Sequence, residues 1–157
     1  MSYIIHSNRE RISLAKWDKD LFIKTIKESC QTRISNIVVD LVKFTEDEAD
    51  SVSWGRGEGY GTMTFKCKSI DYGLLPLFHL TSNGQIKFPL NHLKQKINKK
   101  EIIREYQLKL ESNFMMYFDE EVYPTDIFYT IDELFVMQIE VQKFILTIQG
   151  LSARLHQ

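Results

Sequence analysis

Hydrophobic residues near the start of the chain recur at helical spacing. Between residues 21 and 42 they follow one another at three- and four-residue steps, as on one face of an amphipathic helix. Asp18 or Asp20 can cap its start, because a side-chain carboxylate accepts from the free N–H groups of the first turn. The pattern predicts one long helix or two short ones, closed by the acidic segment TEDEAD.

The period changes to two beyond Ser51. Polar and apolar residues alternate in Ser51–Trp54 and again in Thr62–Lys68, which is typical of strands with one buried face. The segments IDYG and SNG predict turns, and SNG is a strong hairpin signal. Pro76 lies in the next apolar run, LLPLFHL, and favours an edge strand or a bulge because proline donates no hydrogen bond. These patterns predict an antiparallel meander of three or four strands.

Helical spacing returns after Pro89. Asn91 is the expected cap, and a break near Asn98 divides the helical stretch into two. The segment DEEVYPTDIFY is expected to be a loop or a short extended piece. The whole pattern predicts a single α+β domain over residues 1–157. It has N-terminal helices, a three- to four-stranded antiparallel meander, and C-terminal helices with a long final helix.

The predicted final helix, residues 130–157, has a heptad pattern. It opens at Thr130–Glu133, a capping-box sequence. Seven apolar residues then follow at alternating steps of three and four, as in a coiled-coil seam. The seam residues are Leu134, Met137, Val141, Phe144, Ile148, Leu151 and Leu155. Two interpretations are open: the helix lies on the core of its own domain, or it joins two copies into a homodimer.

Four of the seven glycines lie in the stretch WGRGEGYGTMTF, at Gly55, Gly57, Gly59 and Gly61. A dinucleotide loop has the spacing G-x-G-x-x-G and opens a helix, and a Walker loop ends in Gly-Lys-Ser/Thr. Here the spacing is G-x-G-x-G-x-G, and the alternating run TMTFKCK follows. We interpret the glycines as positions where the chain turns, bulges and re-enters the sheet. No cofactor is predicted.

The same stretch belongs to a wider pattern. Trp54–Gly57, Gly61–Phe65, Leu77–Leu80 and Gly84–Phe88 together resemble a small sheet module of uncharacterised bacterial proteins, W-G-x-G…G-S-F…L-F…G-x-I-x-F. The resemblance covers about residues 15–95, and this chain has Gly-Thr-Met-Thr-Phe where the pattern has Gly-Ser-Phe. It implies a sheet between helices, sometimes beside restriction-type or other DNA-linked domains. It implies no catalytic residue.

Charge is unevenly distributed along the 157 residues, although the net charge is only −1. Residues 61–110 carry nine Lys/Arg and three Asp/Glu, whereas residues 111–157 carry two and eight. The basic middle can attract an anionic partner. Alternatively, it faces the acidic tail, within one molecule or across a dimer. Both interpretations stay open.

The candidate binding residues are mostly basic. Three lysines lie on the polar side of the predicted strands, five basic residues lie on the following helical stretch, and one arginine and one histidine complete the set. They are Arg56, Lys66, Lys68, His79, Lys87, Lys94, Lys96, Lys99, Lys100 and Arg104. Such a surface can follow the phosphates of a nucleic acid. Aromatic residues do not alternate with the lysines, as stacking platforms for bases would require.

Sequence signals for catalysis and for metal binding are poor. Asp71 with Gln85–Lys87 imitates the acidic residues and lysine of a restriction-type nuclease, but the acidic ligands are too few. Cys67, His79 and His92 are of ligand type but lack short-range ligand spacing. No G-x-S-x-G elbow is present. We predict no catalytic residue and no metal.

The sequence also indicates the compartment and the class of function to expect. No apolar run approaches the roughly 20 residues that span a bilayer, no signal peptide is recognised at the N-terminus, and two cysteines form no disulfide framework. We expect a cytoplasmic, non-enzymatic binding or assembly protein that forms a homodimer through its final helix, with no membrane partner. The alternatives are a nucleic-acid-associated accessory protein that uses the basic residues, and an enzyme with an unrecognised site around Arg56, His79 and His92.

Overall fold

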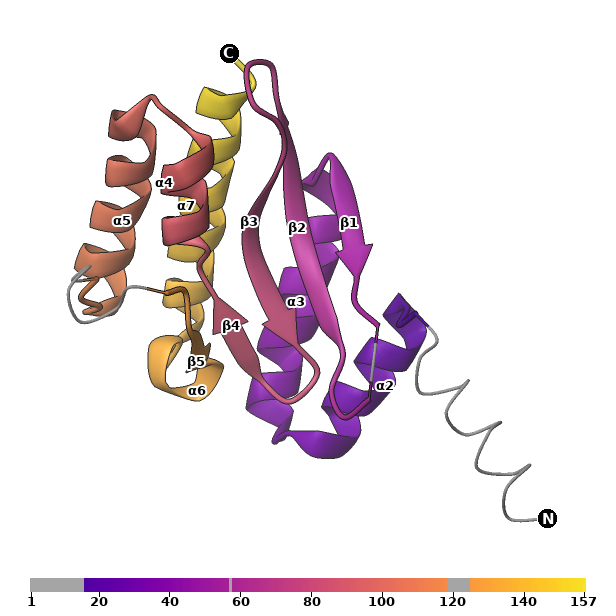
Figure 1. Ribbon diagram of the computed structural model, residues 1–157. Helices are drawn as coiled ribbons and strands as arrows, with labels where there is room; N and C mark the ends of the chain where they lie inside the picture. Colours follow the sequence, from indigo (N-terminus) through magenta and orange to yellow (C-terminus); the bar gives the residue numbers. More distant parts are fainter. Residues whose placement is uncertain (1–15, 57, 119–124) are drawn as a thin grey trace.

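The protein has an α+β architecture, as predicted. A computed structural model describes residues 16–56, 58–118 and 125–157. The helices are α2 (Lys19–Ser29), α3 (Thr32–Glu48), α4 (Leu90–Lys96), α5 (Lys100–Phe114), α6 (Ile131–Leu134) and α7 (Gln138–Leu155). The strands are β1 (Ser51–Trp54), β2 (Thr62–Ser69), β3 (Gly73–Thr81), β4 (Gln85–Lys87) and β5 (Phe128–Thr130). Figure 1 shows α3 and α7 behind the sheet, and none of the described helices is long and apolar enough to cross a membrane.

The N-terminal apolar stripe forms two helices. Asp18 caps α2, and its Oδ1 accepts from the N–H of Leu21 at 2.8 Å. The chain leaves the helical conformation at Cys30 and Gln31, so α3 starts anew. The hydroxyl of Ser35 donates to the carbonyl of Ile26 at 3.1 Å, which ties the second helix back to the first.

The strands form one antiparallel sheet in the order β1-β2-β3-β4-β5. Gly73 and Gly84 have positive φ at the hairpin turns before β3 and β4, where side chains other than glycine are strained. The register between β2 and β3 shifts at Phe65/Lys66, opposite Pro76, so of the edge strand or bulge that Pro76 predicts the structure has a bulge. The described residues form five strands, where three or four were predicted. Strand β5 comes after residues 119–124 of the predicted loop, which lie outside the described residues.

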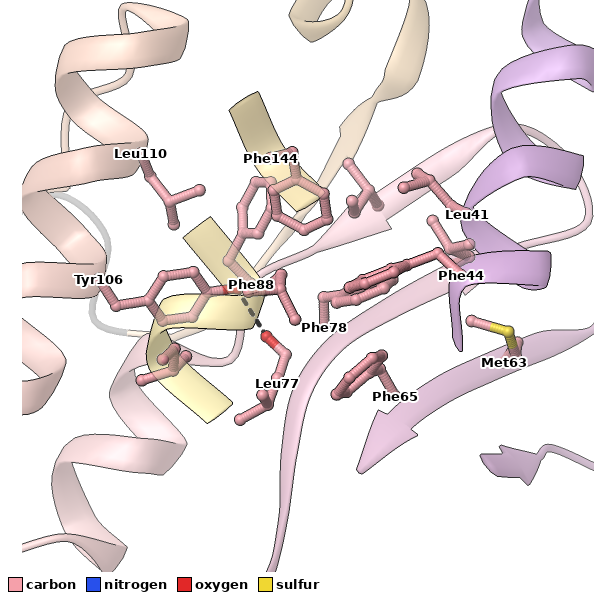
Figure 2. Packing of buried hydrophobic residues seen from close by; sticks show 14 of the residues in the cluster. Leu41, Phe44, Met63, Phe65, Leu77, Phe78, Phe88, Tyr106, Leu110 and Phe144 are labelled. Atoms are coloured by element: carbon pink, nitrogen blue, oxygen red, sulfur yellow. Dashed lines mark hydrogen bonds between the residues drawn. The ribbon is translucent and has the colours of Figure 1, made fainter. Parts of the chain in front are cut away.

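The core lies between the inner face of the sheet and the helices behind it. Phe65 of β2 stacks between Phe44 of α3 and Phe78 of β3, with ring centroids 5.4 Å apart in both pairs. Phe144 of α7 meets Phe78 edge-on at 5.0 Å and also contacts Phe88. Figure 2 shows these rings as one continuous cluster. Aromatic contacts from α3, α7 and the sheet therefore hold the two layers together.

Helices α4 and α5 cover the part of β3 that β4 does not reach. The β3–β4 pairing is limited to His79–Lys87 and Leu80–Ile86, so the first half of β3 has a free edge. There the buried hydroxyl of Tyr106 on α5 donates to the carbonyl of Leu77 at 2.7 Å (Figure 2). A side chain thus satisfies a carbonyl that would otherwise be buried without a partner.

The C-terminal helical stretch is divided, contrary to the prediction of one helix from residue 130. The chain leaves the helix at the buried Phe135 and resumes it at Gln138. One carboxylate oxygen of Glu140 accepts from the N–H groups of Val136 and Met137, each at 2.9 Å. Glu140 therefore supplies the cap that the sequence pattern assigned to Thr130, whose side chain caps nothing.

The predicted seam faces the core of its own chain. All seam residues except Met137 are buried, and Met137 is 60% exposed. Val141, Phe144 and Ile148 of α7 belong to the same cluster as the inner face of the sheet. Packing within one molecule accounts for the heptad pattern.

The glycine run leads into a strand, as predicted. Strand β2 starts at Thr62, directly after Gly61. A Cβ on Gly61 would lie 2.3 Å from the ring of Trp17, so the close approach of these two segments requires glycine. Gly59 has a φ of +85°, a conformation that side chains disfavour. Gly57 and the N-terminal residues 1–15 lie outside the described residues.

Candidate anion-binding surface

The outer face of the sheet is polar. Because side chains alternate along a strand, residues paired across neighbouring strands share one face. The register places Ser53, Thr64, His79, Lys87 and Phe128 in a single row across all five strands. The helices α3 and α7 pack on the opposite face (Figure 1).

The charge on the five described strands has one sign. They contain no aspartate or glutamate, while β2 carries Lys66 and Lys68 and β4 carries Lys87. Lys66 and Lys87 are half-buried and Lys68 is exposed. Because no residue of the described strands is acidic, these lysines create a region of positive potential on the outer face.

His79 lies at the centre of this face. Its Nδ1 and the hydroxyl of Thr64 are 2.7 Å apart and hydrogen-bonded. Burial lowers the pKa of His79 to about 4, and the charges of Lys87, His92 and Lys66 act in the same direction. The imidazole is therefore neutral at pH 7 and offers hydrogen bonds, but no charge, to a ligand.

A basic groove lies beside the sheet, on α4 and α5. It has a volume of about 380 Å³. Its floor includes the buried Ile97 and Ile103. Its polar lining residues are Lys94, Lys100, Arg104 and Gln107. Basic side chains above an apolar floor can hold a phosphate or carboxylate while their aliphatic stems stay packed.

The other predicted binding residues are spread out. Lys96 is exposed on α4, and Lys99 forms an ion pair with Asp71 at 3.3 Å. Arg56 follows β1, at the opposite edge of the sheet from α4, and its backbone forms an isolated antiparallel β-bridge with that of Lys16. The structure therefore brings Lys66 and Lys87 close to His79 and assembles the groove residues separately. Lys68, which pairs with Leu74, and Arg56 lie away from both groups.

A carboxylate of the acidic tail contacts the backbone at the start of the basic helix α4. The carboxylate of Asp126 accepts from the backbone N–H groups of Asn91 and His92 at 2.9 and 3.1 Å. Asp126 therefore caps the first turn of α4, where Asn91 was predicted to act. This contact fixes the start of the helix that carries Lys94.

A second group of polar side chains, which sequence reasoning missed, lies on the inner side of the sheet. Cys67 Sγ is 3.5 Å from Nε2 of His156, and the same Nε2 is 2.7 Å from Oδ2 of Asp50. Burial raises the pKa of Cys67 to about 11, while the hydrogen bond with His156 and the N–H of Lys68 lower the pKa of Asp50. Cys67, His79 and His92, which are of ligand type but were not predicted to bind a metal, are not brought together, because Cys67 points to the core and His79 to the outer face.

Comparisons with known proteins add no assignment to this geometry. No protein-family model matches the chain, and searches of curated proteins and of solved structures found no significant match. We therefore infer a function from the arrangement of the chain's own residues.

Proposed function

We propose that the protein is a non-enzymatic binding protein that holds a nucleic acid on the outer face of the sheet and in the α4–α5 groove. The observation that carries this proposal is the charge of the described strands, which include three lysines and no carboxylate. Globular surfaces usually intersperse both signs of charge. A sheet face whose charged residues are all positive, with a basic groove beside it, instead favours the binding of a polyanion.

The expected binding mode is mainly electrostatic. Lys66 and Lys87 stand beside the neutral His79, whose imidazole can hydrogen-bond to a sugar or base edge without adding charge. Lys87 Nζ lies 4.7 Å from the centroid of the Phe128 ring, so this aromatic face is already in contact with a cation. We expect affinity to fall steeply with salt and to depend little on base sequence.

The test is a fluorescence-anisotropy titration of labelled single-stranded and duplex oligonucleotides at several salt concentrations. Lys66→Glu/Lys87→Glu should weaken binding and reduce the slope of log Kd against log salt concentration by about 0.7 to 0.9 for each phosphate that is no longer neutralised. Lys43→Glu/Lys143→Glu is the matched control, because it makes the same change in net charge at exposed positions on α3 and α7. Equal losses in the two double variants, or no binding by the unmodified protein, would refute the proposal.

A homodimer is the second candidate function, through a different surface from the predicted seam. Several apolar residues are exposed at the start of α7 and along its outer side: Val136, Met137, Ile139 and Leu146. Ile139 and Leu146 are seven residues apart, so they lie on the same side of the helix. Exposed apolar residues aligned in this way favour contact with another copy.

Sedimentation at increasing protein concentration tests the dimer. Ile139→Lys/Leu146→Lys should shift the protein towards the monomer, whereas Leu108→Lys, at an exposed apolar position on α5, should leave the association unchanged. A protein that remains monomeric at every concentration would rule this candidate out and leave the nucleic-acid proposal intact.

A further inference from the structure

Three different metal-ligand types converge where the end of α7 meets β2. They are the carboxylate of Asp50, the thiol of Cys67 and the imidazole of His156. Their ligand atoms all lie within 4.8 Å of one another. Figure 1 shows this end of α7 next to the β2–β3 hairpin, away from α6 and the α2–α3 turn. The cluster is separate from the nucleic-acid surface proposed above, because Cys67 faces the core side of the sheet.

The arrangement differs from a nucleophilic relay. A Cys-His-Asp relay uses both ring nitrogens of histidine, one for the nucleophile and one for the acid. Here the single atom Nε2 lies 3.5 Å from Sγ of Cys67 and 2.7 Å from Oδ2 of Asp50. Three atoms that converge on one point, and do not lie in series, are arranged as ligands around a cation.

The separation of the sulfur and nitrogen ligands fits a zinc ion. With Zn–S near 2.3 Å and Zn–N near 2.0 Å, tetrahedral geometry places sulfur and nitrogen about 3.5 Å apart. That is the observed separation of Sγ and Nε2. Nitrogen and oxygen ligands need about 3.3 Å between them, so the 2.7 Å contact has to widen slightly. Thiolate, imidazole and carboxylate are all ligands that Zn²⁺ prefers.

The backbone holds two of the three ligands in place. Oδ2 of Asp50 accepts from the N–H of Lys68 at 2.6 Å, and the Asp50 N–H donates to the carbonyl of Lys66 at 3.0 Å. Cys67 lies between these two residues on β2, so its position relative to Asp50 is fixed by strand geometry. An outer hydrogen bond that orients a ligating carboxylate is a regular feature of metal sites.

The third ligand comes from the end of α7. The N–H of His156 donates to the carbonyl of Ser152 at 3.0 Å, which continues the helical pattern. The same Ser152 carbonyl lies 4.0 Å from Sγ of Cys67, so this turn of the helix borders the cluster. The buried hydroxyl of Ser152 lacks a hydrogen-bond partner among the described residues.

One side of the cluster faces solvent. The side chains of Asp50 and His156 are 35% and 45% exposed, whereas Cys67 is buried. An ion can therefore enter without unfolding the core, and a water molecule can occupy the fourth position. Three protein ligands with one open position are typical of zinc sites that bind or activate a small molecule.

We propose that Asp50, Cys67 and His156 form a binding site for Zn²⁺, completed by water. Coordination replaces the proton of the Cys67 thiol, and that proton passes to solvent. The ion links three segments that are distant in sequence: the residues after α3, strand β2 and the end of α7. It therefore fastens the C-terminal helix to the sheet as well as presenting an open coordination position.

The experiment titrates the chelator-treated full chain with Zn²⁺ by calorimetry and follows thermal unfolding at each concentration. We expect one strong site per chain and a Tm that rises with Zn²⁺, because the ion binds only the folded arrangement. His156→Ala and Asp50→Asn should each weaken binding by at least about tenfold, the range seen even for residues that merely support a ligand. Co²⁺ should give thiolate-to-metal absorption in the unmodified chain, and Cys67→Ser should abolish it.

Two controls match the ligand variants. Cys30→Ser removes the other thiol, and His92→Gln removes an exposed histidine on α4. Both should retain the binding site and the Co²⁺ absorption. The proposal is overturned if the unmodified chain binds Zn²⁺ no more tightly than His156→Ala does, or if Co²⁺ binds without thiolate absorption. Because the His156 side chain is exposed, the comparison with His156→Ala does not depend on whether the Cys67 variant folds.

Discussion

Lowering the pH from about 7.5 to 5 is expected to destabilise the protein through His79. The pKa of this imidazole is about 4 in the folded protein and close to 6.5 in an unfolded chain. The unfolded state therefore binds the proton more tightly, and stability that is fully present above pH 6.5 is lost as the pH falls towards 4. Linkage gives a loss of about 2 kcal/mol at pH 5, with a limit of about 3 kcal/mol below pH 4.

The measurement is urea unfolding at both pH values for the unmodified protein and for His79→Gln. Glutamine does not titrate and can still hydrogen-bond to the Thr64 hydroxyl, so the variant should lose most of this pH dependence. The difference between the two proteins isolates His79 from carboxylates such as Asp50 and Glu105, whose lowered pKa values also destabilise the fold in acid. Equal pH dependence in both proteins would refute the assignment of a buried, neutral imidazole.

Three further predictions concern the core and the glycines. Tyr106→Phe should destabilise the fold by about 1 to 3 kcal/mol in urea unfolding, because it leaves a buried carbonyl of β3 without its donor. Phe144→Ala should cost about 3 to 5 kcal/mol in the same assay, since this ring contacts four others. Gly61→Ala should lower stability by about 1 to 3 kcal/mol because its Cβ would clash with Trp17. The control Gly150→Ala, in an open helical position, should raise stability by about 0.5 to 1 kcal/mol.

Local patterns were sufficient to predict most of the fold. The alternation in β2 and the turn glycines before β3 and β4 depend on neighbouring residues, so the sequence reveals them directly. Strand β5 was not predicted because three residues contain too little alternation to indicate a strand. The break before α7 was missed for another reason: Phe135 is drawn into the core, and Glu140 caps the new start. Tertiary packing decides both features.

The basic outer face of the sheet and the cluster of Asp50, Cys67 and His156 differ in how far the sequence could predict them. Lys66, Lys87 and His79 share the outer face because strand periodicity and register place them there. Asp50 and His156 are 106 positions apart, and they meet only because α7 docks against β2. No spacing rule links residues so distant. The seam pattern of α7 was equally ambiguous, since a helix on its own core and a helix in a dimer require the same apolar spacing.

The most direct test of the proposed function is a map of backbone amide chemical shifts by NMR as an oligonucleotide is added. We expect the largest changes on the outer-face residues of β2, β3 and β4, together with α4 and α5, around Lys66, His79, Lys87 and Arg104. Changes confined to α3 and the outer side of α7, or no changes at moderate salt, would contradict it.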